Sequence, residues 1–186
     1  MKIFVFLGSL ALATGAFAES KHDHHKHHNK AAKDQHQGHQ HKKADKSGTV
    51  AFDKSMQVAV KPYLAIQEAF ATDMFTGVPA EAQKIVDAAK KIDPKQVKGE
   101  HAGHYKDVPS NMKKQGEALA KAKNIKDARE IFKKLSQPFA MWVSMAKPAN
   151  LQVVYCPMAK ASWLQKKGTT VANPYLTNMP KCGNII

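Results

Sequence analysis

The chain has 186 residues, 43% of them apolar and 24% charged, and its 29 Lys and Arg residues against 15 Asp and Glu residues give a formal net charge of +14. A chain of this length fits one modest domain with an appendage, which excludes large multidomain enzymes. Its two cysteines are too few for a disulfide-rich scaffold, so we expect the fold to depend on an apolar core.

The N-terminus has the features of a secretory signal. Lys2 precedes an apolar run over residues 3–13, and small residues end the stretch at Ala18. This pattern predicts a signal peptide over residues 1–18. The run is too short to cross a bilayer comfortably, and no later segment has the roughly 20 consecutive apolar residues of a membrane helix. We therefore predict a periplasmic or secreted protein, without a nucleic-acid partner and without a transmembrane segment in the mature chain.

The next segment is rich in histidine. Residues 19–48 contain no aromatic residue and no aliphatic side chain larger than alanine, which predicts a disordered His-rich tail. Neutral imidazole is a good ligand for Cu(II), Ni(II) and Zn(II), so we expect polydisperse, weakly selective metal binding there; a solubilising polar tail is the alternative. The tail histidines are His22, His24, His25, His27, His28, His36, His39 and His41.

Helical periodicity follows the tail. Apolar residues recur every three or four positions in four stretches, the clearest of which begins after Asn124, a typical capping residue. The pattern predicts a mainly α fold, with a four-helix up-and-down bundle over residues 49–147. Pro138 falls inside the last stretch and predicts a kink or a break there. Earlier prolines suit the first turns of helices, and we expect helices to begin near Pro62, Pro79, Pro94 and Pro109.

The pattern changes after Pro148. Residues 151–155 form a short β-like run, and the remainder is rich in Pro, Asn, Gly and Lys. We predict that residues 148–186 form a short β and irregular segment packed on the bundle. Both cysteines lie in this segment, in a Cys-x-Met motif at 156–158 and a Met-x-x-Cys motif at 179–182.

Four sulfur-containing residues in this segment, Cys156, Met158, Met179 and Cys182, form a candidate metal site. Thiolate and thioether donors favour Cu(I) over harder ions, whereas zinc usually takes Cys and His ligands and no histidine lies in this segment. The alternative is a disulfide between the two cysteines, with the methionines as packing residues. Two cysteines of an exported domain pair by default, and closing this loop would add roughly 3.5 kcal/mol. The spacing alone leaves both interpretations open.

Short sequence blocks carry a family resemblance. These are Tyr-Leu-x-Ile-x-Glu-Ala-Phe at 63–70, Ala-Arg-x-x-Phe-x-x-Leu-Ser at 128–136, Cys-Pro-Met at 156–158, Trp-Leu at 163–164, Asn-Pro-Tyr at 173–175 and Met-x-x-Cys-Gly at 179–183. Together they resemble a bacterial periplasmic family catalogued as a domain of unknown function (number 3347 of its series), over roughly residues 56–186. That family occurs alone or appended to copper- and silver-efflux proteins. The resemblance implies copper handling, with the four sulfur residues as ligands and a copper-efflux component as a partner.

Two further histidines and the remaining methionines have less specific patterns. His101 and His104 lie between the second and third predicted helices, and such a pair can share one metal with Met112 nearby; solvated loop histidines are the alternative. Other methionines fall on apolar stripes, where we expect them to fill the core. These are Met56, Met74, Met141 and Met145.

The sequence contains no convincing catalytic motif, so we expect a protein that is not an enzyme. The favoured hypothesis is a periplasmic copper-binding protein, acting as a buffer or carrier in metal tolerance. It would hold Cu(I) at the sulfur site and Cu(II), Ni(II) or Zn(II) on the His-rich tail. The alternative is a secreted, basic helical interaction module with a Cys156–Cys182 disulfide and no specific metal.

Overall fold

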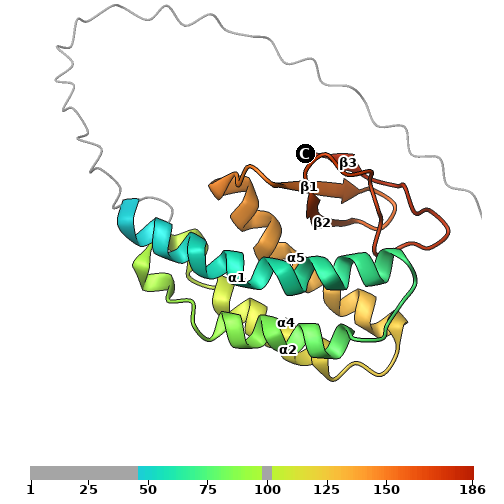
Figure 1. Ribbon diagram of the computed structural model, residues 1–186, viewed down its shortest axis with the longest axis horizontal. Helices are drawn as coiled ribbons and strands as arrows, with labels where there is room; N and C mark the ends of the chain where they lie inside the picture. Colours follow the sequence, from blue (N-terminus) through green and yellow to red (C-terminus); the bar gives the residue numbers. More distant parts are fainter. Residues whose placement is uncertain (1–45, 98–101) are drawn as a thin grey trace, which may run out of the picture. The chain divides into compact units, whose positions relative to one another are not determined.

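The computed structural model describes residues 46–97 and 102–186, with side chains described from residue 51 onward. The predicted signal peptide, the tail histidines and His101 lie outside the described residues. The described part is mainly helical, as the sequence predicts, and ends in a small antiparallel sheet where the sequence predicts a short β and irregular segment (Figure 1). Within these ranges, no helix combines the length and the apolar character that crossing a bilayer requires.

The first helix, α1 (Lys46–Ala71), runs through Pro62, so the predicted helix start at this proline is wrong. A proline inside a helix removes the hydrogen bond to the carbonyl four residues earlier, at a cost of about 3 kcal/mol. That carbonyl belongs to Val58, a residue that is 63% exposed. The apolar stripe continues on both sides of Pro62, and its burial maintains one helix: Phe52, Met56, Tyr63, Ile66 and Phe70 are fully buried.

Two other prolines do begin helices. Pro79 and Pro109 lie in the first turns of α2 (Val78–Ala89) and α4 (Val108–Ala120), as predicted. These helices approach closely because α4 carries Gly116 at the contact. A Cβ atom there would lie 2.8 Å from Cγ2 of Val86, so a larger residue would push the two helices apart.

Pro94 begins a shorter element than the sequence predicts. It starts the 3-10 turn η1 (Pro94–Gln96), and the side chain of Asp93 accepts a hydrogen bond from the Lys95 N–H at 2.9 Å. A four-residue helix, α3 (Ala102–Tyr105), follows. The long helices are therefore α1, α2, α4 and the C-terminal α5.

The last helix, α5 (Ile125–Ala146), begins as predicted. The side chain of Asn124 accepts a hydrogen bond from the N–H of Asp127 at 2.9 Å and caps the helix. The predicted break at Pro138 is wrong, because α5 continues to Ala146. The burial of Phe132, Leu135, Phe139 and Trp142 on both sides of Pro138 maintains one helix, as in α1.

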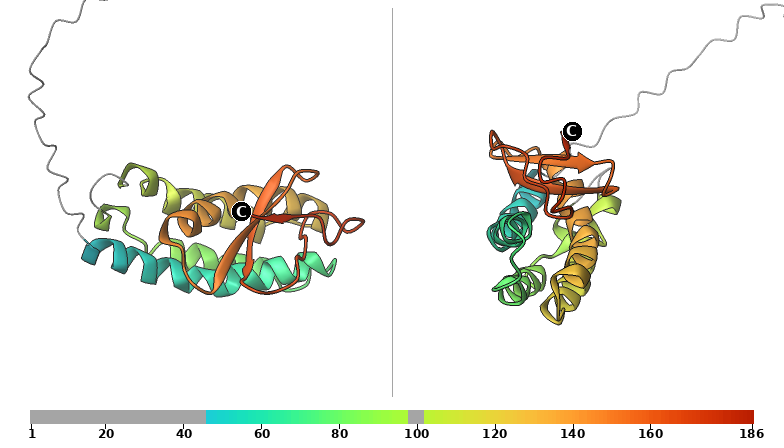
Figure 2. Two further views of the ribbon diagram at one scale, coloured as in Figure 1. Left: turned by 90° about the horizontal axis from the view of Figure 1, so that it is seen from above. Right: turned by 90° about the vertical axis from the view of Figure 1, so that its right-hand side faces the viewer.

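The predicted β-like run is part of a three-stranded sheet. The strand β1 (Leu151–Cys156) lies between β2 (Ala161–Lys166) and β3 (Asn184–Ile185), and both pairings are antiparallel. Figure 2 shows the sheet lying across α1 and α5, while α2 and α4 lie on the side of the helices away from it. Lys160 lines a pocket with Lys133 and Gln137 of α5, so the β1–β2 turn, which carries Met158, lies beside that helix.

Candidate metal centre

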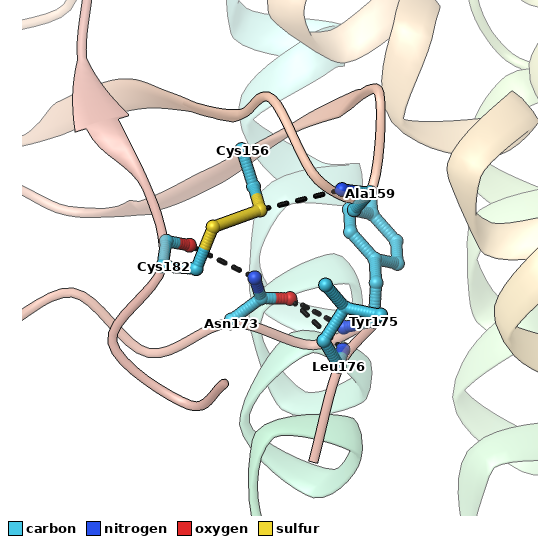
Figure 3. The surroundings of a disulfide bond; sticks show 6 residues. All are labelled: Cys156, Ala159, Asn173, Tyr175, Leu176 and Cys182. Atoms are coloured by element: carbon cyan, nitrogen blue, oxygen red, sulfur yellow. Dashed lines mark hydrogen bonds between the residues drawn. A yellow bond between two sulfur atoms is a disulfide. The ribbon is translucent and has the colours of Figure 1, made fainter. Parts of the chain in front are cut away.

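The two cysteines lie beside the end of β1 and the beginning of β3. Cys156 is the last residue of β1, and Cys182 lies two positions before β3, which pairs with β1. Their Cα atoms are 5.6 Å apart, and a disulfide joins their sulfurs (Figure 3). The structure thus contains the bond that the sequence leaves as an alternative. The bond does not decide between the two functions, because the thiols of a soft metal site also oxidise.

The surroundings of the two sulfurs differ. Cys156 is fully buried, and its Sγ accepts a hydrogen bond from the backbone N–H of Ala159 at 3.4 Å across the β1–β2 turn. An N–H group directed at sulfur stabilises the charged form of a thiol, which is the form that binds metals. Cys182 is partly exposed, and its own N–H donates to the carbonyl of Met179 at 3.0 Å, which closes the second turn.

Asn173 holds the segment that contains Cys182. Its side chain is buried, and its Nδ2 donates to the Cys182 carbonyl at 2.8 Å. Its Oδ1 accepts hydrogen bonds from the N–H groups of Tyr175 at 2.8 Å and Leu176 at 3.1 Å (Figure 3). The backbone N–H of Asn173 donates to Pro180 at 2.8 Å. The Asn173 side chain thus binds the backbone on both sides of Met179, before it at Tyr175 and after it at Cys182.

Glycine is required next to Cys182 for a different reason. A Cβ atom at Gly183 would lie 2.6 Å from Cγ1 of Val154 and 2.7 Å from Cη2 of Trp163. Both of these side chains are fully buried and have little room to move. The absence of a side chain at Gly183 therefore allows the Cys182 segment to pack against β1 and β2.

The loop after Asn173 is anchored to the helices by buried hydroxyl groups. The Tyr175 hydroxyl lies 2.8 Å from the Ser162 carbonyl oxygen and 3.0 Å from Ser136 Oγ, and Tyr63 Oη lies 2.7 Å from the same Ser136 oxygen. The Leu164 N–H donates to Tyr63 Oη at 3.1 Å. Burial raises the pKa of Tyr63 and of Tyr175, so both phenols stay neutral and available for hydrogen bonding.

The two methionines of the candidate site lie at the surface. Met158 is 64% exposed and Met179 is 37% exposed, so neither is the packing residue that the disulfide alternative supposed. Each lies in the same turn as one cysteine. Four sulfur atoms are therefore carried by two turns that a disulfide joins, with the two thioethers accessible to solvent.

The other candidate ligands are dispersed among the described residues. Met112 is fully buried whereas His104 is exposed, so these two do not form a site together. His104 instead lines a cavity of about 400 Å³ between α4 and α5, with Asp107 and Met141. Nowhere in 46–97 and 102–186 do three His, Cys, Asp or Glu side chains converge as metal ligands.

The remaining methionines mostly pack as expected. Met56 is fully buried, and Met141 and Met145 pack against the core. The core position predicted for Met74 is wrong, because it lies beyond the end of α1 and is 54% exposed.

Comparison with known proteins finds a relationship in the helical part of the chain. Residues 59–150 match the family described as "Protein of unknown function (DUF3347)". This match supports the family identity that the sequence blocks suggest. It ends before Cys156, so the sulfur motifs and any association with copper efflux lie beyond it. No curated protein and no solved structure matches the chain.

The supporting residues of the site were not singled out by sequence reasoning. Asn173, Tyr175 and Gly183 lie in the family-like blocks, but the blocks alone give them no role. Their roles depend on contacts with distant residues, such as Tyr175 with Ser136. The sequence signal that could have indicated them is their position in short motifs close to Cys182.

Replacing Asn173 tests its role as the anchor of the Cys182 segment. We expect Asn173→Ala to lower the free energy of unfolding by about 3 kcal/mol, because three side-chain hydrogen bonds are lost and buried N–H and C=O groups lose partners. Urea unfolding of the oxidised protein measures the effect. Asn178→Ala, at an exposed position of the same loop, is the matched control and should change stability by less than about 0.5 kcal/mol. Equal effects of the two substitutions would contradict the anchoring role.

Proposed function

We propose that this protein is a periplasmic copper-binding protein that acts as a buffer or carrier in metal tolerance. Its reduced form would bind Cu(I) through the thiolates of Cys156 and Cys182, with thioether ligands from Met158 and Met179. The observation that carries the proposal is the contact between the two cysteines on turns that each present an exposed methionine. The activity is binding and transfer, and no catalytic step is involved.

The spacing of the cysteines supports a shared ion. Their Cα atoms are 5.6 Å apart, so reduction of the disulfide leaves two thiols that can reach one metal without rearranging the strands. The Ala159 N–H already points at the Cys156 sulfur and would stabilise it as a thiolate ligand. The ordered turns around Asn173 reduce the entropy lost when the ligands gather around the ion.

The composition of the segment supports the choice of metal. Residues 148–186 contain no Asp, Glu or His, so ligands for harder ions are missing, while thiolates and thioethers suit Cu(I). Two thiolates with one Cu(I) carry a net charge of −1. The exposed side chains of Lys160 and Lys181, in the turns next to the cysteines, offset this charge. Acidification would weaken binding because protons compete for the thiolates.

Two parts of the proposal rest on sequence alone. Residues 1–18 support export, and the histidines of residues 22–41 support a second, weaker and less selective store for Cu(II), Ni(II) or Zn(II). A copper-efflux component is the partner that the family resemblance suggests. In this scheme the tail collects ions at high capacity, whereas the sulfur site holds one ion tightly.

A competition assay tests the cysteine ligands. We expect the fully reduced protein to take one Cu(I) from a chromogenic chelator, and the Cys156→Ser, Cys182→Ser double variant to bind it more than about 100-fold more weakly, since even supporting groups of metal sites contribute 10- to 100-fold. The oxidised wild-type protein should behave like the variant. Equal Cu(I) uptake by the reduced wild type and the double variant would rule out the sulfur site.

Replacing the methionines tests the thioether ligands separately. The Met158→Leu, Met179→Leu double variant keeps the side-chain size at two exposed positions and removes only the sulfur. We expect its affinity for Cu(I) to fall by about tenfold, with its thermal stability unchanged. Met74→Leu is the matched control, because Met74 is also exposed but lies outside the two turns. A loss of affinity shared by the control would show that the thioethers at 158 and 179 are not specific ligands.

A second candidate function is favoured by the disulfide itself. A secreted, basic helical module held by a Cys156–Cys182 bond would dock on an acidic envelope protein or an anionic surface, using the surplus of lysine. The same competition assay separates the candidates. This alternative expects no difference in Cu(I) affinity between the reduced wild type and the double cysteine variant.

A further inference from the structure

The two cysteines of the disulfide differ in how far they are buried. Cys156 is fully buried at the end of β1, whereas Cys182 is partly exposed and follows the exposed residues Pro180 and Lys181. Thiol–disulfide exchange requires a thiolate to reach one sulfur along the line of the existing bond, so access decides which sulfur is attacked. An external thiol therefore reaches Cys182 more readily than Cys156.

Cys156 Sγ is also the better leaving group of the two sulfurs. The backbone N–H of Ala159 is hydrogen-bonded to Cys156 Sγ at 3.4 Å and stabilises negative charge on that sulfur when the bond breaks. Burial opposes a charge there, and the N–H group offsets part of this cost. Both the accessibility of Cys182 and the hydrogen bond to Cys156 favour the same direction of exchange.

We propose that Cys182 is the site at which an external thiol reductant joins the protein and opens the disulfide. The reductant thiolate forms a new S–S bond with Cys182 Sγ, and the electron pair of the broken bond leaves on Cys156. A second thiolate of the reductant then attacks the reductant sulfur of the mixed disulfide and releases Cys182 as a thiolate. The reductant departs as its own disulfide, having given two electrons to the protein.

The charged residues of the two turns that contain the cysteines are lysines. Lys181 is exposed beside Cys182, and Lys160 is exposed in the turn that contains the partner cysteine. No Asp or Glu occurs in residues 148–186, so no nearby acidic residue of this segment offsets the attraction. These lysines attract a thiolate to Cys182, and they attract a reductant with additional negative charges more strongly.

The exchange gives the proposed metal site a redox control. Oxidised protein has no thiolate ligands, whereas reduction at Cys182 frees both cysteines. This regulatory role rests on the proposed function, but the site of exchange does not, because the reaction involves no metal.

Mass spectrometry of a trapped intermediate tests the proposal. Oxidised, metal-free full-length protein is mixed with a limiting amount of reduced glutathione, quenched with acid and alkylated with N-ethylmaleimide. We expect peptides with glutathione on Cys182 and maleimide on Cys156 to exceed the reverse pair by at least about tenfold. The same reaction in guanidinium is the control, and there the preference should vanish.

Three outcomes would overturn the proposal: glutathione mainly on Cys156, equal labelling of the two cysteines in the folded protein, or no exchange until the protein unfolds. Lys181→Glu supplies an independent measurement, because it should slow exchange about threefold at low salt. Lys167→Glu, at an exposed turn position after β2, is its matched control. Equal rates for the two variants would contradict the role of charge. Failure of this experiment leaves the copper competition result unaffected, so the two proposals can fail separately.

Discussion

The hydroxyl group of Tyr63 is buried at the centre of a hydrogen-bond network that joins the helices to the C-terminal segment. It comes from α1, contacts Ser136 of α5 and accepts a hydrogen bond from the backbone of β2. Ser136 in turn contacts the hydroxyl of Tyr175 in the C-terminal loop. Two helices, the sheet and the loop therefore meet at a few polar atoms inside an apolar core. Because each of these atoms would be costly to leave unpaired, the network fixes where the C-terminal segment sits.

The anchored loop transmits this placement to the sulfur atoms. Arg129 strengthens the anchor, since it donates to the carbonyls of Phe70 and Pro174 and pairs with Asp73. Asn173 then holds the Cys182 segment, and the disulfide joins it to β1. The helices thus support the two short turns with exposed methionines, where the proposed copper site lies. In the disulfide-bonded protein this support holds the two Cα atoms 5.6 Å apart.

The sequence could predict the secondary-structure elements better than the tertiary contacts between them. The cap at Asn124, the first-turn prolines at 79 and 109 and the β-like run after Pro148 all follow from local rules, and the structure confirms them. The predicted helix start at Pro62 and the predicted break at Pro138 are wrong because local rules do not weigh tertiary packing. In both helices the burial of a long apolar stripe on either side of the proline outweighs the lost hydrogen bond. The roles of Asn173 and Tyr175 could not be predicted from local rules. Tyr175 contacts Ser136, which is distant in the sequence, and Asn173 binds the backbone of Cys182 across a folded loop.

We propose that the reduced turns form a Cu(I) site made only of sulfur, and X-ray absorption at the copper edge identifies the neighbours of the ion. The full-length protein would be reduced and loaded with one equivalent of Cu(I). A site made of the two thiolates and two thioethers gives scattering from sulfur neighbours alone, and the Cys156→Ser, Cys182→Ser variant should lose that shell. A copper environment of nitrogen neighbours from the His-rich tail, unchanged in the variant, would contradict it.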